Sequence, residues 1–186
     1  MYIIKENDTV YFARAAGFLT QNVSVDSGLA VTPENACVWK APNDDNIMVM
    51  ASRRSAAVDQ IRYDPEIFSG EVTFDRIITE FMPKLKRVFA RFGKLDKDGD
   101  FTSSFALAQN GKVFILTIIG FCEEVTDFAT AGYCAELALT TLRLTQGKSP
   151  AERFVLLKKM LDDNSADRDT TLTVMDTKTF NLYLIK

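Results

Sequence analysis

The sequence contains no histidine and only three cysteines in its 186 residues. Without histidine, the chain cannot form a Ser-His-Asp triad, a Cys-His nucleophile pair, an HExxH zinc site or an imidazole proton shuttle. The cysteines, at positions 37, 122 and 134, are odd in number and lack CxxC spacing, which disfavours a disulfide framework and a cysteine zinc site. Any catalysis must therefore use carboxylates, Lys, Tyr, Cys, Ser, Thr or a terminal amine.

The chain also lacks a strong charge bias and a long apolar run. Its 22 Lys and Arg residues against 25 Asp and Glu residues give a net charge of −3, which does not indicate a nucleic-acid partner. The longest apolar run, Val113 to Cys122, is about half of the ~20 residues needed to cross a bilayer, and the first residues lack the apolar core of a signal peptide. We therefore expect a single cytoplasmic domain over residues 1–186, with no membrane partner, cofactor or metal.

Hydrophobic periodicity predicts eight strands and four helices. The dipeptide Asn110-Gly111 is a strong hairpin signal, and Ser149-Pro150-Ala151-Glu152 is a capping box with proline at the first helical position. Pro83 lies inside a predicted helix and should kink it. The predicted strands span residues 2–4, 9–16, 37–40, 47–51, 104–109, 112–118, 171–175 and 180–185, and the predicted helices span 52–63, 73–92, 123–144 and about 149–161.

The order of these elements indicates the fold class. Strands come in antiparallel hairpins and helices come in pairs, which argues against a doubly wound parallel sheet. Each group of strands is apolar enough to be covered on both faces. The sequence therefore predicts an α+β protein, a four-layer αββα sandwich in which two antiparallel sheets stack and a pair of helices covers each outer face.

This ordered set of elements resembles the proteasome subunits and their bacterial two-component peptidase relatives, which are N-terminal-nucleophile hydrolases. Thr9-Val10-Tyr11-Phe12-Ala13 resembles the second strand of that family, and Asp45-Asn46-Ile47 resembles the region that enters the first helix. Ser104 to Ala108 and Asn110 to Phe114 resemble the central hairpin, and Ser149 to Arg153 resembles the start of the fourth helix. The similarity covers nearly the whole chain and implies the sandwich fold and a threonine-type peptidase ancestry.

The chain departs from the family at the positions that carry chemistry. In active members the first residue is a Thr whose hydroxyl attacks the substrate while its own α-amine acts as general base, a mechanism that needs no histidine. Here no Thr, Ser or Cys precedes the first strand, and Met1 falls about two positions too late. The resemblance places the supporting acid near Ala15, the lysine near Cys37 and the serine near Gly132 or Tyr133. We therefore assign no catalytic, cofactor-binding or metal-binding residue.

Several local patterns have a functional and a structural interpretation. Cys37 is a candidate nucleophile, but Lys40, the nearest cation along the chain, should face the opposite side of the strand. Lys40 with Asp44 or Asp45 is either the remnant of a site or part of a solvated loop.

Three further patterns also have both a functional and a structural interpretation. Arg53-Arg54, with Arg62 nearby, either binds an anion at a helix start or contacts solvent or another subunit. Asp96-Lys97-Asp98-Gly99-Asp100 is better explained as a turn than as a calcium loop, because glycine and glutamate do not occupy the required positions. The phenylalanines of the 73–92 helix form core, interface or both.

Two functional hypotheses follow. The first is a proteasome-like subunit that is not catalytic and has a structural, assembly or regulatory role, in a homo-oligomer or with a paralogous subunit. The second is an active amidohydrolase or peptidase that uses an atypical nucleophile such as Cys37, or a chain whose mature start differs. The absent nucleophile favours the first hypothesis, and the sequence identifies no substrate.

Overall fold

The computed structural model describes residues 1–15, 37–53, 55–117, 120–132, 134–164 and 170–185. The strands of the first sheet are β1 (Tyr2–Glu6), β2 (Thr9–Ala15), β8 (Phe128–Thr130), β9 (Leu172–Asp176) and β10 (Leu182–Ile185). Those of the second are β3 (Val38–Ala41), β4 (Asp44–Ala51), β5 (Phe105–Gln109), β6 (Lys112–Leu116) and β7 (Cys122–Glu124). The helices are α2 (Ala56–Tyr63), α3 (Phe74–Arg76), the π-helix η1 (Ile77–Phe81), α4 (Met82–Arg91), α5 (Ala135–Leu144) and α6 (Pro150–Asn164).

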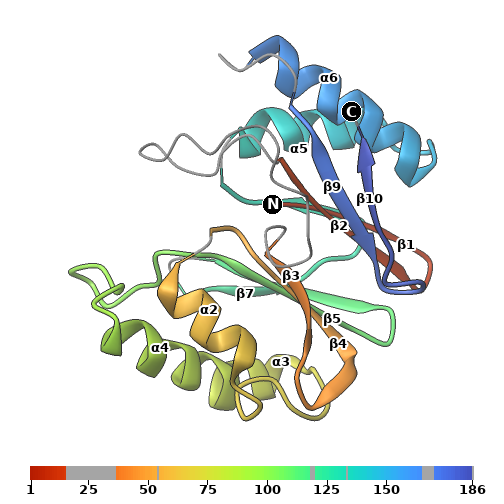
Figure 1. The fold of residues 1–186 in the computed structure, drawn as a ribbon. Helices are drawn as coiled ribbons and strands as arrows, with labels where there is room; N and C mark the ends of the chain where they lie inside the picture. The colour runs from red at the N-terminus through yellow and green to blue at the C-terminus, as the bar shows by residue number, and fades with distance from the viewer. Residues whose placement is uncertain (16–36, 54, 118–119, 133, 165–169, 186) are drawn as a thin grey trace.

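These elements form four layers (Figure 1). The first sheet has the strand order β10-β9-β2-β1-β8 and the second has the order β3-β4-β5-β6-β7. All the strand pairings in both are antiparallel. Helices α5 and α6 cover the outer face of the first sheet, and α2 with the α3–η1–α4 segment covers the outer face of the second. The predicted αββα sandwich is confirmed.

Three separate apolar cores account for the layers. The inner core packs the two sheets against each other and includes Phe12 of β2 and Met48 of β4. A second core packs β4 and β5 against α2 and α4, and a third packs β1 and β9 against α5 and α6. Alternation along each strand produces this division, because successive side chains point to opposite faces of a sheet. Both sheets are therefore apolar on both faces.

One predicted helix is wrong in part. The sequence predicts a helix over residues 123–144, but helix α5 begins only at Ala135, and β7 and β8 occupy the first part of the range. Both strands lie at a sheet edge, where exposed charged residues are tolerated. In β7 the exposed Glu123 and Glu124 interrupt the alternation of apolar and polar residues by which a strand is predicted. Gly132, with φ of +93°, separates β8 from the helix in a backbone conformation that a helix does not accept.

The kink predicted at Pro83 takes the form of a π turn. The amide of Met82 donates to the carbonyl of Ile77, five residues back, so η1 adds one residue to a turn of the helix. Pro83 has no amide hydrogen and follows directly in the first turn of α4. As a result, the apolar stripe splits. Phe81 and Phe89 are fully buried, whereas Phe74, which precedes the π turn, is 51% exposed. Phe92 is 37% exposed for another reason, since it lies past the last helical residue of α4.

A buried arginine joins the first sheet to its helical layer. The guanidinium of Arg153 in α6 forms an ion pair with Asp127, at 3.2 Å, and donates to the carbonyl of Leu142 in α5, at 2.9 Å. It also lies over the ring of Phe128 in β8, 5.1 Å from its centroid. One side chain therefore connects two helices and an edge strand.

The different burial of Phe89 and Phe92 predicts unequal effects of two similar substitutions. The ring of Phe89 packs against Phe101 and Phe105, with centroids 5.5 and 5.9 Å away, and Phe89→Ala should lower the free energy of unfolding by about 3–5 kcal/mol. Phe92→Ala, three residues on, should cost less than about 1 kcal/mol because that ring is already partly in water. Urea unfolding monitored by circular dichroism tests both, and equal losses would contradict the structure.

Candidate functional site

Four chain segments meet at one end of the space between the two sheets. Met1 precedes β1, Arg14 lies near the end of β2, Cys37 precedes β3, and Ala131 follows β8. The α-amine of Met1 donates to the carbonyl of Ala131 at 2.9 Å, and the amide of Ala131 donates to the carbonyl of Met1 at 2.9 Å. Figure 1 shows the start of the chain between the two sheets. Backbone pairing beyond the ends of the strands therefore builds this site, which we call the strand-end site.

A buried guanidinium and a buried thiol form the centre of the strand-end site. Nη1 of Arg14 donates to Sγ of Cys37, and both side chains are buried. The backbone of Cys37 has φ of +54°, a left-handed conformation that is uncommon for a residue other than glycine and is found often at functional sites. A guanidinium beside a thiol stabilises the thiolate, the nucleophilic form of cysteine.

The α-amine of Met1 is the third polar group of the site. Complete burial, followed by the nearby charge of Arg14, lowers its pKa from 8.0 to about 5, and Cys37 opposes this shift. The amine is therefore neutral at pH 7, with a lone pair that can accept a proton. A thiol, a fixed cation and a neutral amine are the chemical groups of a nucleophilic site, although the same contacts also make a satisfied buried cluster.

Three segments to which the sequence comparison assigns family positions lie in this cluster, whose cation the sequence reasoning misses. It assigns the family positions for the nucleophile, lysine and serine to the neighbourhoods of Met1, Cys37 and Gly132, and the structure brings these segments together. Ala15, at the position of the acid, packs in the core beneath α5 and α6. Arg14 was missed, although Val10, Phe12 and Arg14 alternate on the inner face of β2, a pattern that points Arg14 between the sheets.

The other candidates lie elsewhere. Cys37 packs into the core beneath α2 and α4, whereas Nζ of Lys40 lies over the ring of Phe180, which borders the inner core, 3.9 Å from its centroid. The two side chains therefore contact different groups, the thiol of Cys37 the guanidinium of Arg14 and the ammonium of Lys40 the ring of Phe180. Asp44 accepts hydrogen bonds from the amide of Asn46 and from the side chain of Gln109, so its carboxylate links the start of β4 to the end of β5. Asp45 is exposed.

The arginines of the predicted anion site are separated by a helix. Arg53 lies before α2, whereas Arg62 is in its last turn and lies over the rings of Trp39 and Tyr63, 5.7 and 5.9 Å from their centroids. Arg54 and Tyr133 fall outside the described residues. Asp96 accepts the amides of Asp98 and Asp100, which is the bonding of a turn.

The remaining thiols are separate from the strand-end site. Burial, with help from Glu123, raises the pKa of Cys122 to about 11, which keeps this thiol protonated and unreactive. Cys134 is half-buried at the start of α5, and the described cysteines form no disulfide. Within the described residues no group of potential ligands suits a metal ion, and no helix is long and apolar enough to cross a membrane.

Comparison with solved structures identifies the fold. A Thiobacillus denitrificans BPH in complex with epoxomicin superposes with a TM-score of 0.66 over 94% of this chain and 96% of that chain, at 11% identity. The same protein alone gives 0.66 over 94% and 95%, at 12% identity, and eukaryotic HslV from Trypanosoma brucei gives 0.60 over 94% and 97%, at 12% identity. This chain has the proteasome-like fold of the N-terminal-nucleophile hydrolases. No protein-family model and no curated protein matches the sequence.

The buried amine predicts a particular pH dependence of stability. Between pH 8 and pH 5 the α-amine of the unfolded chain binds a proton that the folded chain does not, because the pKa of Met1 is about 5 when folded. Stability should therefore decrease as the pH falls through this window, by up to about 1.4 kcal/mol per pH unit. Urea unfolding at pH 8 and pH 5.5 measures the slope, and Nα-acetylated protein is the control. The same slope in both proteins would exclude the amine as its source.

Proposed function

We propose that this chain is a non-catalytic subunit of a proteasome-like assembly, with a structural, assembly or regulatory role. The contact between Arg14 and Cys37 carries the proposal. The resemblance implies an acid and a lysine around the nucleophile of active members, and here the corresponding region holds a buried arginine and a thiol. Since a guanidinium does not deprotonate, Arg14 cannot serve as a proton acceptor. The strand-end site then acts as a packed junction between the sheets.

The absence of turnover is the first expected outcome. Fluorogenic peptides should not be cleaved above the rate in buffer, because covalent catalysis requires an accessible nucleophile with its base. Epoxomicin, the compound bound to BPH, should give no adduct detectable by intact-protein mass spectrometry. An adduct at any residue of the chain, or cleavage that increases with protein concentration, would contradict a non-catalytic role.

The strand-end site also supports a second candidate, a thiol hydrolase in which Cys37 attacks a carbonyl carbon. In this mechanism the neutral α-amine of Met1 takes the thiol proton and Arg14 stabilises the thiolate. The C–N bond of the substrate then breaks as the leaving amine takes that proton, and water hydrolyses the acyl-thioester to restore the thiol. Cys37→Ala would then abolish turnover, whereas Cys122→Ala, which removes another buried thiol, would leave it unchanged. This pair of variants separates the candidates: only the thiol hydrolase predicts activity that depends on Cys37.

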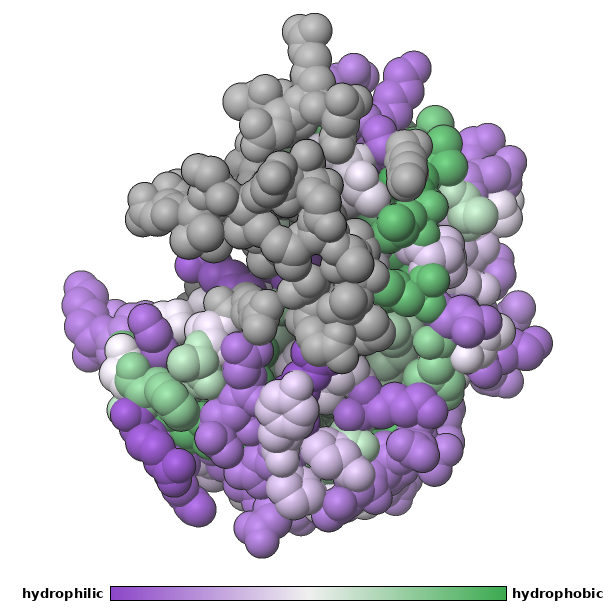
Figure 2. Space-filling view, viewed as in Figure 1, coloured by the Kyte–Doolittle hydropathy of each residue, from purple (hydrophilic) through white to green (hydrophobic). Residues whose placement is uncertain are grey.

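We further infer that the chain assembles into an oligomer, with copies of itself or with a paralogous subunit. Apolar side chains remain exposed on both helical layers, and Figure 2 shows apolar surface over both halves of the visible face. On the outer surface of the second helical layer, Phe74 and Ile78 lie one turn apart and are both exposed. Proteasome-like folds of this kind typically occur in oligomers, in agreement with this inference.

Light scattering tests the assembly. The wild-type chain should exceed the mass of a 20.8 kDa monomer at micromolar concentration. Replacing Phe74 and Ile78 together by Ser should shift the chain toward the monomer, because the shared apolar area would be lost. Leu144→Ser changes a side chain that is 80% exposed on the other helical layer, so a shift toward the monomer in this variant alone would place the interface on that layer instead. A monomeric wild-type protein would exclude self-assembly.

Two properties of the whole chain complete the proposal. We infer that residues 1–186 act as one domain, since the two sheets share the inner core and each helical layer packs on a sheet. We also infer a cytoplasmic location, which is in agreement with the free thiols of the described cysteines.

A further inference from the structure

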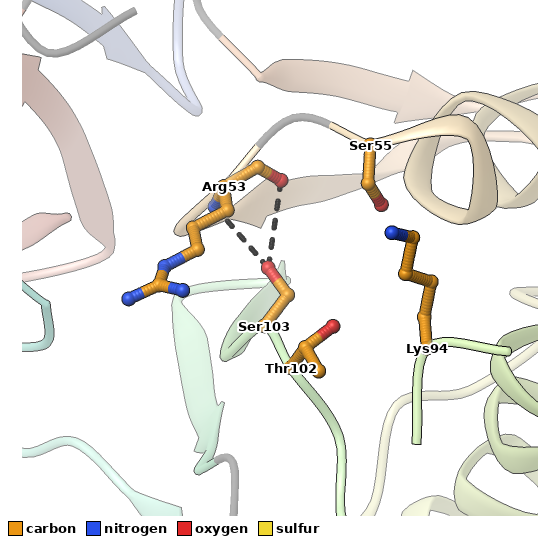
Figure 3. A pocket seen from close by; sticks show the side chains of 5 residues that line it. All are labelled: Arg53, Ser55, Lys94, Thr102 and Ser103. Carbon is orange, nitrogen blue, oxygen red and sulfur yellow. Dashed lines mark hydrogen bonds between the residues drawn. The ribbon is translucent and has the colours of Figure 1, made fainter. Parts of the chain in front are cut away.

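A polar pocket lies at the N-terminal end of α2, apart from the strand-end site (Figure 3). It has a volume of about 280 Å³ and is lined by Arg53, Ser55, Lys94, Thr102 and Ser103. All five residues are polar, two are cationic and none is acidic. Acidic residues outnumber basic ones in this chain, 25 to 22, so composition alone does not account for such a lining.

The wall of the pocket is held in place by the ends of β4 and β5. The buried hydroxyl of Ser103 accepts the amide of Arg53 at 3.2 Å and donates to the carbonyl of Arg53 at 3.4 Å. The amide of Ser52 donates to the carbonyl of Ser104, and the amide of Ser104 donates to the hydroxyl of Ser52, both at 2.9 Å. The backbone on which Arg53 stands is therefore fixed.

Lys94 approaches from the end of α4. Gly93 ends that helix with φ of +60°, and the amide of Lys94 donates to the carbonyl of Phe89 at 2.9 Å. In Figure 3 the ammonium of Lys94 points toward the hydroxyl of Ser55, the hydroxyl of Thr102 points into the same space, and the guanidinium of Arg53 extends on the other side of Ser103.

Neither cation has an acidic partner among the described residues. The ion pairs that the structure describes involve other side chains, and the carboxylate of Asp96, in the turn that follows Lys94, accepts two amides of that turn. Two positive charges on one pocket repel each other, and a bound anion removes that repulsion. The charge pattern of the pocket is thus that of an anion site.

We propose that this pocket binds a phosphoryl group, with Lys94 and the hydroxyls of Ser55 and Thr102 contacting its oxygens and Arg53 adding a second positive charge at the wall of the pocket. Lysine and arginine are the usual phosphate partners, and arginine can donate two parallel hydrogen bonds. The volume of about 280 Å³ exceeds the cavity of about 150 Å³ that accommodates benzene, so it admits a phosphate ester as well as the free ion.

The first turn of α2 adds donors to the same site. The hydroxyl of Ser55 accepts the amide of Val58, whereas the amides of Ala56 and Ala57 have no acceptor within the helix. Free amides at a helix start favour a negative ligand. Cations from two segments and hydroxyls from two segments therefore line one space beside the start of a helix, and this site is independent of whether the strand-end site is catalytic.

Calorimetric titration at constant ionic strength tests the proposal. Inorganic phosphate and glycerol 3-phosphate are the two probes, acetate tests carboxylate binding, and chloride keeps the ionic strength equal. We expect saturable binding of the phosphoryl probes and at least tenfold weaker acetate binding. Tighter binding of glycerol 3-phosphate than of phosphate would assign a phosphate ester, and the reverse order would assign the free ion.

Variants connect the binding to the pocket. Lys94→Gln and Arg53→Gln should each weaken phosphate binding about tenfold, as expected for loss of a charge-assisted hydrogen bond. Lys97→Gln removes an exposed lysine of the nearby turn outside the lining and should bind as the wild type does. Thr102→Val, which preserves both charges, should weaken binding by a smaller factor. Unchanged binding in Lys94→Gln and Arg53→Gln, an equal loss in Lys97→Gln, or acetate binding as tight as phosphate would overturn the proposal.

Discussion

The structure depends on one constraint: both faces of both sheets must be removed from water. The inner core alone would leave the outer faces of β1, β9, β4 and β5 exposed, and each of these strands carries buried apolar residues on both sides. Burial contributes about 25 cal/mol for each Å² of apolar surface, so an uncovered sheet face would forfeit a large part of the stability of the fold. The two helical layers, and the side chains that join them to the sheets, follow from this requirement.

The predictable part of the fold is the part determined by local periodicity. The Asn110-Gly111 turn joins β5 and β6 as expected, with both residues at positive φ, and the capping box at Ser149 begins α6 through hydrogen bonds with Glu152. The segment before α5 was predicted wrongly because β7 and β8 are short edge strands whose existence depends on pairing with other strands: β7 pairs with β6 just before it, and β8 pairs with β1 at the other end of the chain. Pairing of this kind leaves little trace in a local pattern.

The strand-end site was predictable in position and not in chemistry. The family resemblance brings Met1, Cys37 and the segment around Gly132 to one place, but the cation of the site comes from Arg14, 23 residues from its partner. A search for cations along the strand of Cys37 finds Lys40, which alternation directs to the other face. The anion pocket was also not predictable from local sequence, because Arg53 and Lys94 line one pocket only after α2 and α4 have packed on the second sheet.

The π turn at η1 has a consequence for how this chain compares with its structural neighbours. An additional residue in one helical turn rotates the side chains of the preceding helical segment by about 100° about the helix axis, relative to those of the following segment. Phe74 and Ile78 are therefore out of phase with Phe81 and Phe89 and point outward, although their spacing in the sequence is that of one continuous stripe. A relative with one residue fewer between Ile77 and Phe81 would present a different face of the same helix, so insertion of a single residue is enough to exchange a buried surface for an exposed one.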